Sequence, residues 1–438
     1  MASPRTPAVD QFRTALRSGD LIRVRALLES DSEVRAAVNA AIGAFGSRPV
    51  GMVRDNLPMV DLLVSYGADL NLKSDWWAGG FGLLEYGCTP EQAAPLIARG
   101  AGVDIFAAAN LGMLDRVREL VSGDPSLVHA RGGDGKTALH CASTVAIATW
   151  LIDQGAEIDA RCVDHESTAA QYLVRDHPDI TRLLIDRGAW FDIFIAVGLR
   201  DLALVERCLH DDPDALSHRI WRGKYRAVHS GERPATREEI GDHRGDIYRW
   251  VFDHNVSALD VAHRLGYDDI VALLEGHATP AQRLLAACWR AERSTAEAIV
   301  AHDPNLVATL QLEQKTLIAD AAHAYRTAAV LLMLDVGFDP LVRGVDQWEP
   351  VRWAAFHGNV ELLRRLLARN PPIGVQDPTY GGTPISQCLY GSLHGWHCRT
   401  GDFATAVQLL IDAGEKPDRA WYPTGRDDVD AVLRRYFS

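Results

Sequence analysis

The stretch "DGKTALHCASTVAIATWLIDQGAEIDA", residues 134–160, holds two short runs of apolar residues separated by a polar turn. Within each run the apolar residues recur at intervals of three and four, which places them on one face of a helix. Two such helices joined by a short turn form an antiparallel pair. One pair cannot bury its apolar face alone, so the unit has to stack against neighbouring copies of itself.

Copies of this unit recur along the whole chain. The endings "GADLN" at 67 and "GAGVD" at 100 are 33 residues apart, as are "GAEID" at 155 and "GAWFD" at 188. A second form of the unit occurs at residues 12–34, 105–128, 193–216 and 284–307. A fixed period of this length is the signature of a repeat solenoid, so the predicted fold class is all-α.

Residues 134–160 closely resemble an ankyrin repeat, in which a T-P-L-H-x-A element opens the first helix and a G-A-D/E element ends the unit. Thr137, Leu139, His140 and Ala142 match that pattern, and Ala138 stands where proline is usual. The resemblance implies an ankyrin-repeat α-solenoid of about a dozen degenerate repeats. It implies that His140 is structural, hydrogen-bonded to the hairpin backbone and the repeat's threonine. It also implies a binding scaffold, because catalysis is rare among such arrays.

The composition restricts the classes of partner. Hydrophobic residues make up 47% and charged residues 24% of the 438 residues, which is typical of a folded protein. A net charge of −13 argues against a nucleic-acid or anionic-membrane surface, since both need a basic face. The seven cysteines form no CxxC pair and favour a reducing compartment. Without an apolar leader or a long apolar run, the sequence predicts a cytoplasmic protein. The absence of phosphate-loop and dinucleotide motifs predicts no cofactor.

The longest departure from the repeat is an insertion at 219–254, "RIWRGKYRAVHSGERPATREEIGDHRGDIYRWVFDH". It is more polar than its surroundings, and it predicts a domain organisation of an N-terminal array (1–218), the insertion, and a C-terminal array (255–438). A loop of this length is usually functional or disordered. The interleaved aromatic residues favour an ordered segment that folds back over the concave groove of the array.

The insertion offers two kinds of chemistry, and a merely solvated loop is the alternative to both. A histidine with a carboxylate partner supplies a general base, and the candidates are His229, Glu232, His243, Asp246 and His254. A guanidinium group clamps a carboxylate or phosphate with two hydrogen bonds. The candidate ligand-binding residues here are Arg222, Tyr225, Tyr248 and Trp250.

A second departure lengthens the inter-helix turn at 392–400, within "LHGWHCRTGD" (393–402). Its candidate catalytic residues are His394 and His397, and its candidate ligand-binding residues are Trp396 and Arg399. The two histidines with Cys398 match no established zinc pattern, and no second cysteine cluster completes a set of four ligands, so no metal site is predicted. If this turn and the insertion both lean inward, they enclose a pocket for a small molecule.

A third departure is "KSDWWAGGFGLLEYGCT" (73–89), which places Trp76 and Trp77 at the tip of a hairpin finger. Indole rings exposed there mark contact with a partner or ligand. The alternative is that the pair packs against the adjacent hairpin, since indole rings are amphipathic.

Two functions fit these observations. The first is a scaffold that binds a protein partner or a small-molecule ligand on its concave face. The second is an unusual enzyme that uses a histidine and a carboxylate for acid–base chemistry on a small polar or anionic molecule, in a groove closed by 219–254 and 393–400. The first predicts an open groove and a mobile loop, and the second predicts His229 or His243 close to Asp246 or Glu232.

Overall fold

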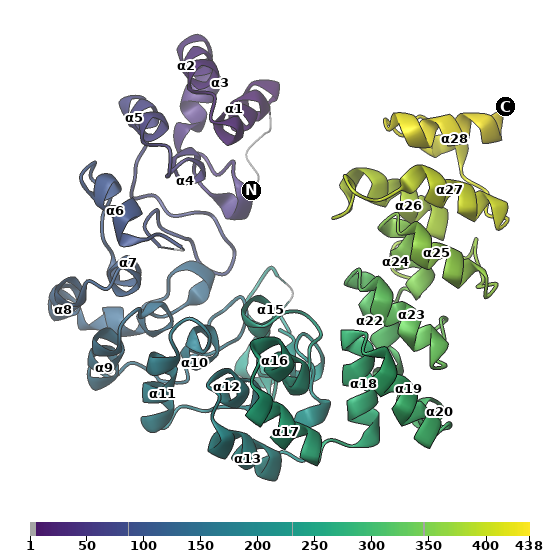
Figure 1. Ribbon diagram of the computed structural model, residues 1–438. Coiled ribbons are helices and arrows are strands. Elements are labelled where there is room, and N and C mark those ends of the chain that lie inside the picture. The colour runs from purple at the N-terminus through teal and green to yellow at the C-terminus, as the bar shows by residue number, and fades with distance from the viewer. Residues whose placement is uncertain (1–5, 86, 230, 345–346) are drawn as a thin grey trace. The chain divides into compact units, whose positions relative to one another are not determined.

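The computed structural model describes residues 6–85, 87–229, 231–344 and 347–438 as short helices joined by turns (Figure 1). The chain forms two compact units. The first comprises Met1–Asp212 and His218–His254, and the second comprises Pro213–Ser217 and Asn255–Ser438. Within the described ranges, β pairing is limited to one isolated antiparallel bridge between Arg161 and Thr168. The predicted all-α architecture is confirmed.

The first unit contains the repeats up to residue 212 and the whole of the insertion. Its α-helices are α1 (Pro7–Ser18), α2 (Leu21–Ser30), α3 (Ser32–Ala36), α4 (Pro49–Met52), α5 (Leu57–Ser65), α6 (Pro90–Ile97), α7 (Ile105–Asn110), α8 (Leu114–Gly123), α9 (Val145–Asp153), α10 (Ala169–Leu173), α11 (Pro178–Asp186), α12 (Ile193–Gly198), α13 (Leu202–Asp211), α14 (Arg237–Ile240) and α15 (Tyr248–Val251). Its 3₁₀ turns are η1 (Ala37–Asn39), η2 (Ala44–Gly46), η3 (Pro125–His129), η4 (Gly133–Gly135), η5 (Ala138–Cys141) and η7 (Gly223–Tyr225).

The second unit continues the same alternation of helices. Its α-helices are α16 (Ala258–Leu265), α17 (Asp268–His277), α18 (Pro280–Arg290), α19 (Arg293–His302), α20 (Leu306–Thr309), α21 (Leu312–Lys315), α22 (Leu317–His323), α23 (Thr327–Asp335), α24 (Pro350–Phe356), α25 (Val360–Leu367), α26 (Pro384–His394), α27 (Phe403–Asp412) and α28 (Asp427–Phe437). Its 3₁₀ turns are η6 (Ala215–Ser217) and η8 (Arg419–Trp421).

The pair α24 and α25 shows how the repeat pattern makes a helix hairpin. Pro350 occupies the first turn of α24, where a missing N–H costs nothing. Gly358 adopts a left-handed φ of 61°, and Asn359 then caps α25 by accepting from the backbone N–H of Leu362. The apolar residues of both helices are buried: Val351, Ala354, Ala355, Leu362, Leu363 and Leu366. The antiparallel helix pair that the apolar spacing of the repeat predicts is present in this unit.

The repeat that best fits the ankyrin pattern has an unusually short first helix. Only the 3₁₀ turn η5 forms there, because Thr144 already caps α9 three residues after η5 ends. Its histidine makes the expected hydrogen bonds. His140 Nδ1 accepts from the backbone N–H of Thr137 at 3.2 Å, and Nε2 donates to the carbonyl of Ser167 in the next hairpin at 3.1 Å. Burial lowers the pKa of His140 to about 3, which keeps the ring neutral.

Two structural observations concern the cysteines and the possibility of a membrane-spanning helix. All seven cysteines are free, and five of them are buried. Among the described residues, the structure contains no helix long and apolar enough to cross a membrane.

Candidate functional site

Two consecutive hairpin tips of the first unit are joined through their backbones. Asp134 lies within η4 with a left-handed φ of 58° and a buried side chain. Its carbonyl accepts hydrogen bonds from the N–H groups of Val163 at 2.8 Å and Asp164 at 3.1 Å. These two bonds fix the hairpin at 161–168 against the preceding one, so they place the Asp164 carboxylate beside that of Asp134.

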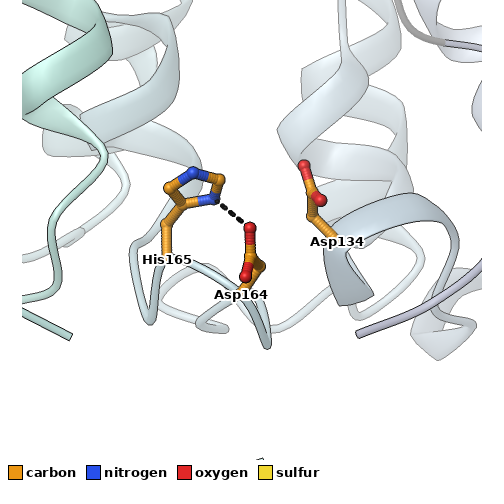
Figure 2. Close-up of side chains that lie close together, drawn as sticks. All are labelled: Asp134, Asp164 and His165. Atoms are coloured by element: carbon orange, nitrogen blue, oxygen red, sulfur yellow. Dashed lines mark ion pairs between the residues drawn. The ribbon is translucent and has the colours of Figure 1, made fainter. Parts of the chain in front are cut away.

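Asp134, Asp164 and His165 form a compact cluster (Figure 2). One ligand atom from each of the three lies within 4.8 Å of the others, and Asp134 and His165 are buried. Within the cluster, His165 Nδ1 lies 3.5 Å from Asp164 Oδ2. Lys136 Nζ lies 3.8 Å from Asp134 Oδ2. Two carboxylates and an imidazole offer an oxygen and nitrogen ligand set of the kind that divalent metal ions accept.

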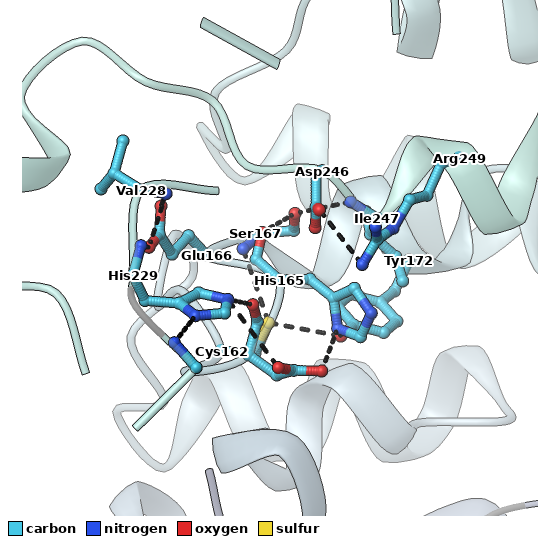
Figure 3. Close-up of polar contacts among 12 residues, drawn as sticks. Cys162, His165, Glu166, Ser167, Tyr172, Val228, His229, Asp246, Ile247 and Arg249 are labelled. Carbon is cyan, nitrogen blue, oxygen red and sulfur yellow. Dashed lines mark hydrogen bonds and ion pairs between the residues drawn. The ribbon is translucent and has the colours of Figure 1, made fainter. Parts of the chain in front are cut away.

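The insertion is anchored to the 161–168 hairpin by its backbone (Figure 3). The buried carboxylate of Glu166 accepts from the N–H groups of Val228 at 3.0 Å and His229 at 2.9 Å. Further along, the N–H of Asp246 donates to the carbonyl of His165 at 2.9 Å, and the N–H of Ile247 donates to Ser167 Oγ at 3.2 Å. The insertion is therefore ordered at two points, one on each side of this hairpin.

These anchors bring two of the candidate catalytic residues to the cluster. His229 Nε2 lies 3.8 Å from Asp164 Oδ1, and its ring packs at a tilt against Trp77 with a centroid distance of 4.7 Å. Asp246 is buried and pairs with Arg249 at 3.3 Å through Oδ2. His243 contributes its carbonyl, which accepts from Arg161 at 2.6 Å, while its ring Nδ1 is buried without a hydrogen-bond partner in the described chain.

The cluster is electrostatically unusual because its charged groups are withdrawn from water. Burial raises the pKa of Asp134 to about 6 and that of Asp246 to about 6, and it raises the pKa of Asp164 as well. Burial, with the nearby Arg249 and Lys136, lowers the pKa of His165 to about 3. At neutral pH the site therefore combines a neutral imidazole with carboxylates whose ionised form is disfavoured by burial.

The other candidates in the first unit have different surroundings. Tyr225 and Tyr248 are in the core beside Phe194, and the Tyr248 hydroxyl donates to Asp192 Oδ1 at 2.9 Å. Trp76 is half-buried and packs edge-on against Phe45 at 4.9 Å. Trp250 is 62% exposed, and Arg222 is half-buried at the start of η7.

The candidates at 393–402 belong to the second unit, where α22, α24 and α26 are the first helices of successive repeats. The lengthened segment extends α26 to His394 and then turns. Gly391 is required in α26, because a Cβ there would lie 2.0 Å from the carbonyl oxygen of Phe356 in α24. The enclosure of one groove by this segment and the 219–254 insertion stays a prediction.

An exposed aromatic surface forms at the C-terminal ends of these three helices. We define it as Tyr325, Tyr390, His394, Trp396 and His397. Trp396 is 64% exposed and Tyr390 is 51% exposed. The rings support one another: His397 stacks on Tyr325 at 4.0 Å, His394 contacts Tyr390 at 4.8 Å, and Trp396 lies parallel to Trp353 at 6.2 Å. Arg399 is exposed in the same turn.

Sequence reasoning missed Asp134, Asp164 and His165 as members of a site. A usable signal was present, since Asp134 and His165 each stand three residues before the threonine that opens a repeat's first helical turn, Thr137 or Thr168. Equivalent positions in adjacent repeats meet in a stacked array.

Comparison with known proteins agrees with the helical array. The ankyrin-repeat family model, with three copies of the repeat, matches residues 105–196. A comparison with curated protein sequences gives no match. The matched range includes α7 to α11, most of α12, and the hairpins that carry Asp134, Asp164 and His165. Residues 105–196 are thus three ankyrin repeats within an all-α solenoid, a fold that generally mediates protein–protein interaction.

Proposed function

We propose that this chain is a cytoplasmic ankyrin-repeat binding protein that recognises a protein partner on its concave face, with about a dozen degenerate repeats in all. The exposed aromatic surface of the second unit carries the proposal. Large aromatic side chains dominate the energy of protein interfaces because they bury much area and lose little conformational entropy. Trp396 and Tyr390 are held by ring contacts yet remain more than half exposed, so a partner can bury much of their surface.

The chemistry of this surface indicates the partner. It carries two imidazoles and two phenol hydroxyls, and Arg399 is an exposed cation in the same turn. Aromatic rings with donors and positive charge complement a segment that presents aliphatic side chains with carboxylates beside them. We therefore expect an apolar segment with acidic flanking residues to bind here.

A crosslinking experiment followed by a titration tests the proposal. Tyr390 is replaced by photoreactive benzoylphenylalanine in the cells that produce the protein, and the same replacement of Trp421 is the control. Trp421 is 41% exposed in the same unit but lies outside the aromatic surface. The protein crosslinked from position 390 is then purified, and its affinity is measured by calorimetry.

We expect Trp396→Ala to weaken that affinity about 30-fold, the effect of losing roughly 2 kcal/mol at an interface hot spot. Trp421→Ala is expected to leave it unchanged. Equal crosslinking from both positions, or equal affinity in wild type and Trp396→Ala, would contradict the proposal.

A second candidate function is acid–base catalysis in the first unit on a small polar or anionic molecule. His229 favours it, because its Nε2 hydrogen-bonds the Asp164 carbonyl and lies 3.8 Å from the Asp164 carboxylate. To act as a general base, its Nδ1 has to give up the hydrogen bond that it accepts from the Gly231 N–H at 2.9 Å. Incubation with a panel of small carboxylates and phosphate esters, followed by NMR, would detect turnover. Turnover that survives both His229→Gln and Asp164→Asn would exclude this pair.

A further inference from the structure

We propose that Asp134, Asp164 and His165 bind a divalent transition-metal ion such as Zn²⁺ or Mn²⁺. The three side chains come from two consecutive hairpin tips, and one ligand atom of each lies within 4.8 Å of the other two. The proposal concerns the first unit and is independent of the aromatic surface.

The geometry is close to that of a bound ion. Ligand atoms about 2.1 Å from a common ion are about 3.4 Å apart in tetrahedral geometry, so the cluster has to contract by at most about 1.4 Å. Small rotations of the side chains provide this contraction. The backbone does not need to move, because the hydrogen bonds from Val163 and Asp164 to the Asp134 carbonyl already fix one hairpin tip against the other.

The imidazole is prepared to be a ligand. A histidine ligates a metal ion through a ring nitrogen, and His165 Nδ1 lies 3.5 Å from the Asp164 carboxylate, on the side of the other ligands. The Tyr172 hydroxyl hydrogen-bonds with His165 Nδ1 at 2.9 Å, and Cys162 Sγ lies 3.3 Å from the same hydroxyl. When Nδ1 binds an ion, this hydroxyl can therefore turn to the sulfur and stay hydrogen-bonded.

A further carboxylate next to the cluster has an unused ligand atom. Asp246 is only 4% exposed, and its Oδ1 is buried without a hydrogen-bond partner in the described part of the chain. Its backbone N–H bonds to the carbonyl of His165, and its charge is close enough to Asp164 for the two carboxylates to repel each other. A buried oxygen without a donor is costly, and an ion or a water bound to that ion would supply the missing positive partner.

The charged groups around the cluster also favour a bound divalent ion. Lys136 faces Asp134 at 3.8 Å and Arg249 pairs with Asp246 at 3.3 Å, so single cations already lie at both ends of the group. Asp164 is between them and faces two imidazoles, those of His165 at 3.5 Å and His229 at 3.8 Å. A divalent ion beside Asp164 would supply positive charge to carboxylates that are buried or half-buried.

Calorimetric titration of the full chain with Zn²⁺, after treatment with a chelator and its removal, tests the proposal. We expect one ion per chain with micromolar or tighter affinity. Asp164→Asn and His165→Gln should each weaken binding about 100-fold. His218→Gln is the matched control, since His218 is a half-buried histidine of the same unit that pairs with Asp212 at 3.0 Å, outside the cluster. Its affinity should equal that of wild type.

A measurement on wild type keeps the test decisive if a ligand variant fails to fold. Pulsed electron paramagnetic resonance with Mn²⁺ as the probe reports the ligand nuclei directly, and we expect coupling to one imidazole nitrogen. Absence of that coupling, an affinity for Zn²⁺ weaker than about 100 µM, or undiminished Zn²⁺ binding in folded His165→Gln would overturn the proposal. Trp396→Ala should bind Zn²⁺ like wild type, so failure here is distinguishable from failure of the proposed partner binding.

Discussion

The insertion at 219–254 and the turn at 395–402 are similar in composition but differ in how their backbones are hydrogen-bonded. The insertion gives its backbone N–H groups to the repeats, to Glu166, His165 and Ser167. The turn has mainly internal backbone bonds: the N–H of Cys398 donates to Gly395 and that of Gly401 to His397, while Asp402 donates to the carbonyl of Gly358. Buried N–H groups need acceptors, and the insertion finds several of them on the neighbouring repeats in addition to its internal bonds.

This difference decides where the side chains are. In the insertion, docking of the backbone carries His229 and Asp246 toward the Asp134, Asp164 and His165 cluster. In the turn, the backbone remains at the surface and Trp396 stays 64% exposed. Similar residue types therefore indicate a buried polar site in one region and a contact surface in the other.

The largest effect should come from removing the anchor of the insertion. Glu166→Ala leaves the N–H groups of Val228 and His229 without their acceptor, and each lost hydrogen bond to a charged group costs about 1.5 kcal/mol or more. We expect the free energy of unfolding to fall by about 3 kcal/mol in urea titrations, with faster amide exchange at 228 and 229. Glu166→Gln, which keeps one acceptor oxygen, should lose less. Unchanged exchange in Glu166→Ala would show that the insertion does not depend on this contact.

A smaller effect should appear in the second unit on acidification. Burial lowers the pKa of His357 from 6.5 to about 4, and its ring contacts both Trp353 and Trp396. The folded state therefore binds fewer protons than the unfolded state between pH 4 and 6.5, so stability is full above pH 6.5 and falls as the pH drops through this window. At pH 5 the loss attributable to His357 should be about 2 kcal/mol.

Unfolding of wild type and His357→Gln at pH 7 and pH 5 measures this contribution. The stability of wild type should fall further between the two values than that of the variant. If both lose the same free energy, His357 is not the group responsible.

The sequence predicted the helix pairs well, since they depend on local spacing. The pairing at 351–370, the turn at Gly358-Asn359 and the role of His140 all follow from residues close together in the chain. The cluster of Asp134, Asp164 and His165 was not predicted, because it depends on how consecutive hairpins stack. The candidate residues of the insertion also differ in burial: Tyr225 and Tyr248 lie in the core, while Trp250 lies at the surface. Their alternation with polar residues did not reveal which would do so.

Trp396→Ala should have the smallest effect on stability. Because the fold is then nearly unchanged, a loss of partner binding in this variant reports on contact alone. Trp396 is 64% exposed, so truncation removes little buried area. Its ring contacts are with His323 at 5.1 Å, His357 at 5.6 Å, Phe356 at 5.8 Å and Trp353 at 6.2 Å. Losing them should change the free energy of unfolding by less than about 1 kcal/mol. Urea unfolding of the second unit, followed by circular dichroism, measures it. A substitution that leaves stability almost unchanged but weakens partner binding about 30-fold identifies a side chain whose role is contact with the partner. A loss of stability above about 2 kcal/mol would instead place Trp396 among the packing residues of its unit, and the contrast with the docked insertion would disappear.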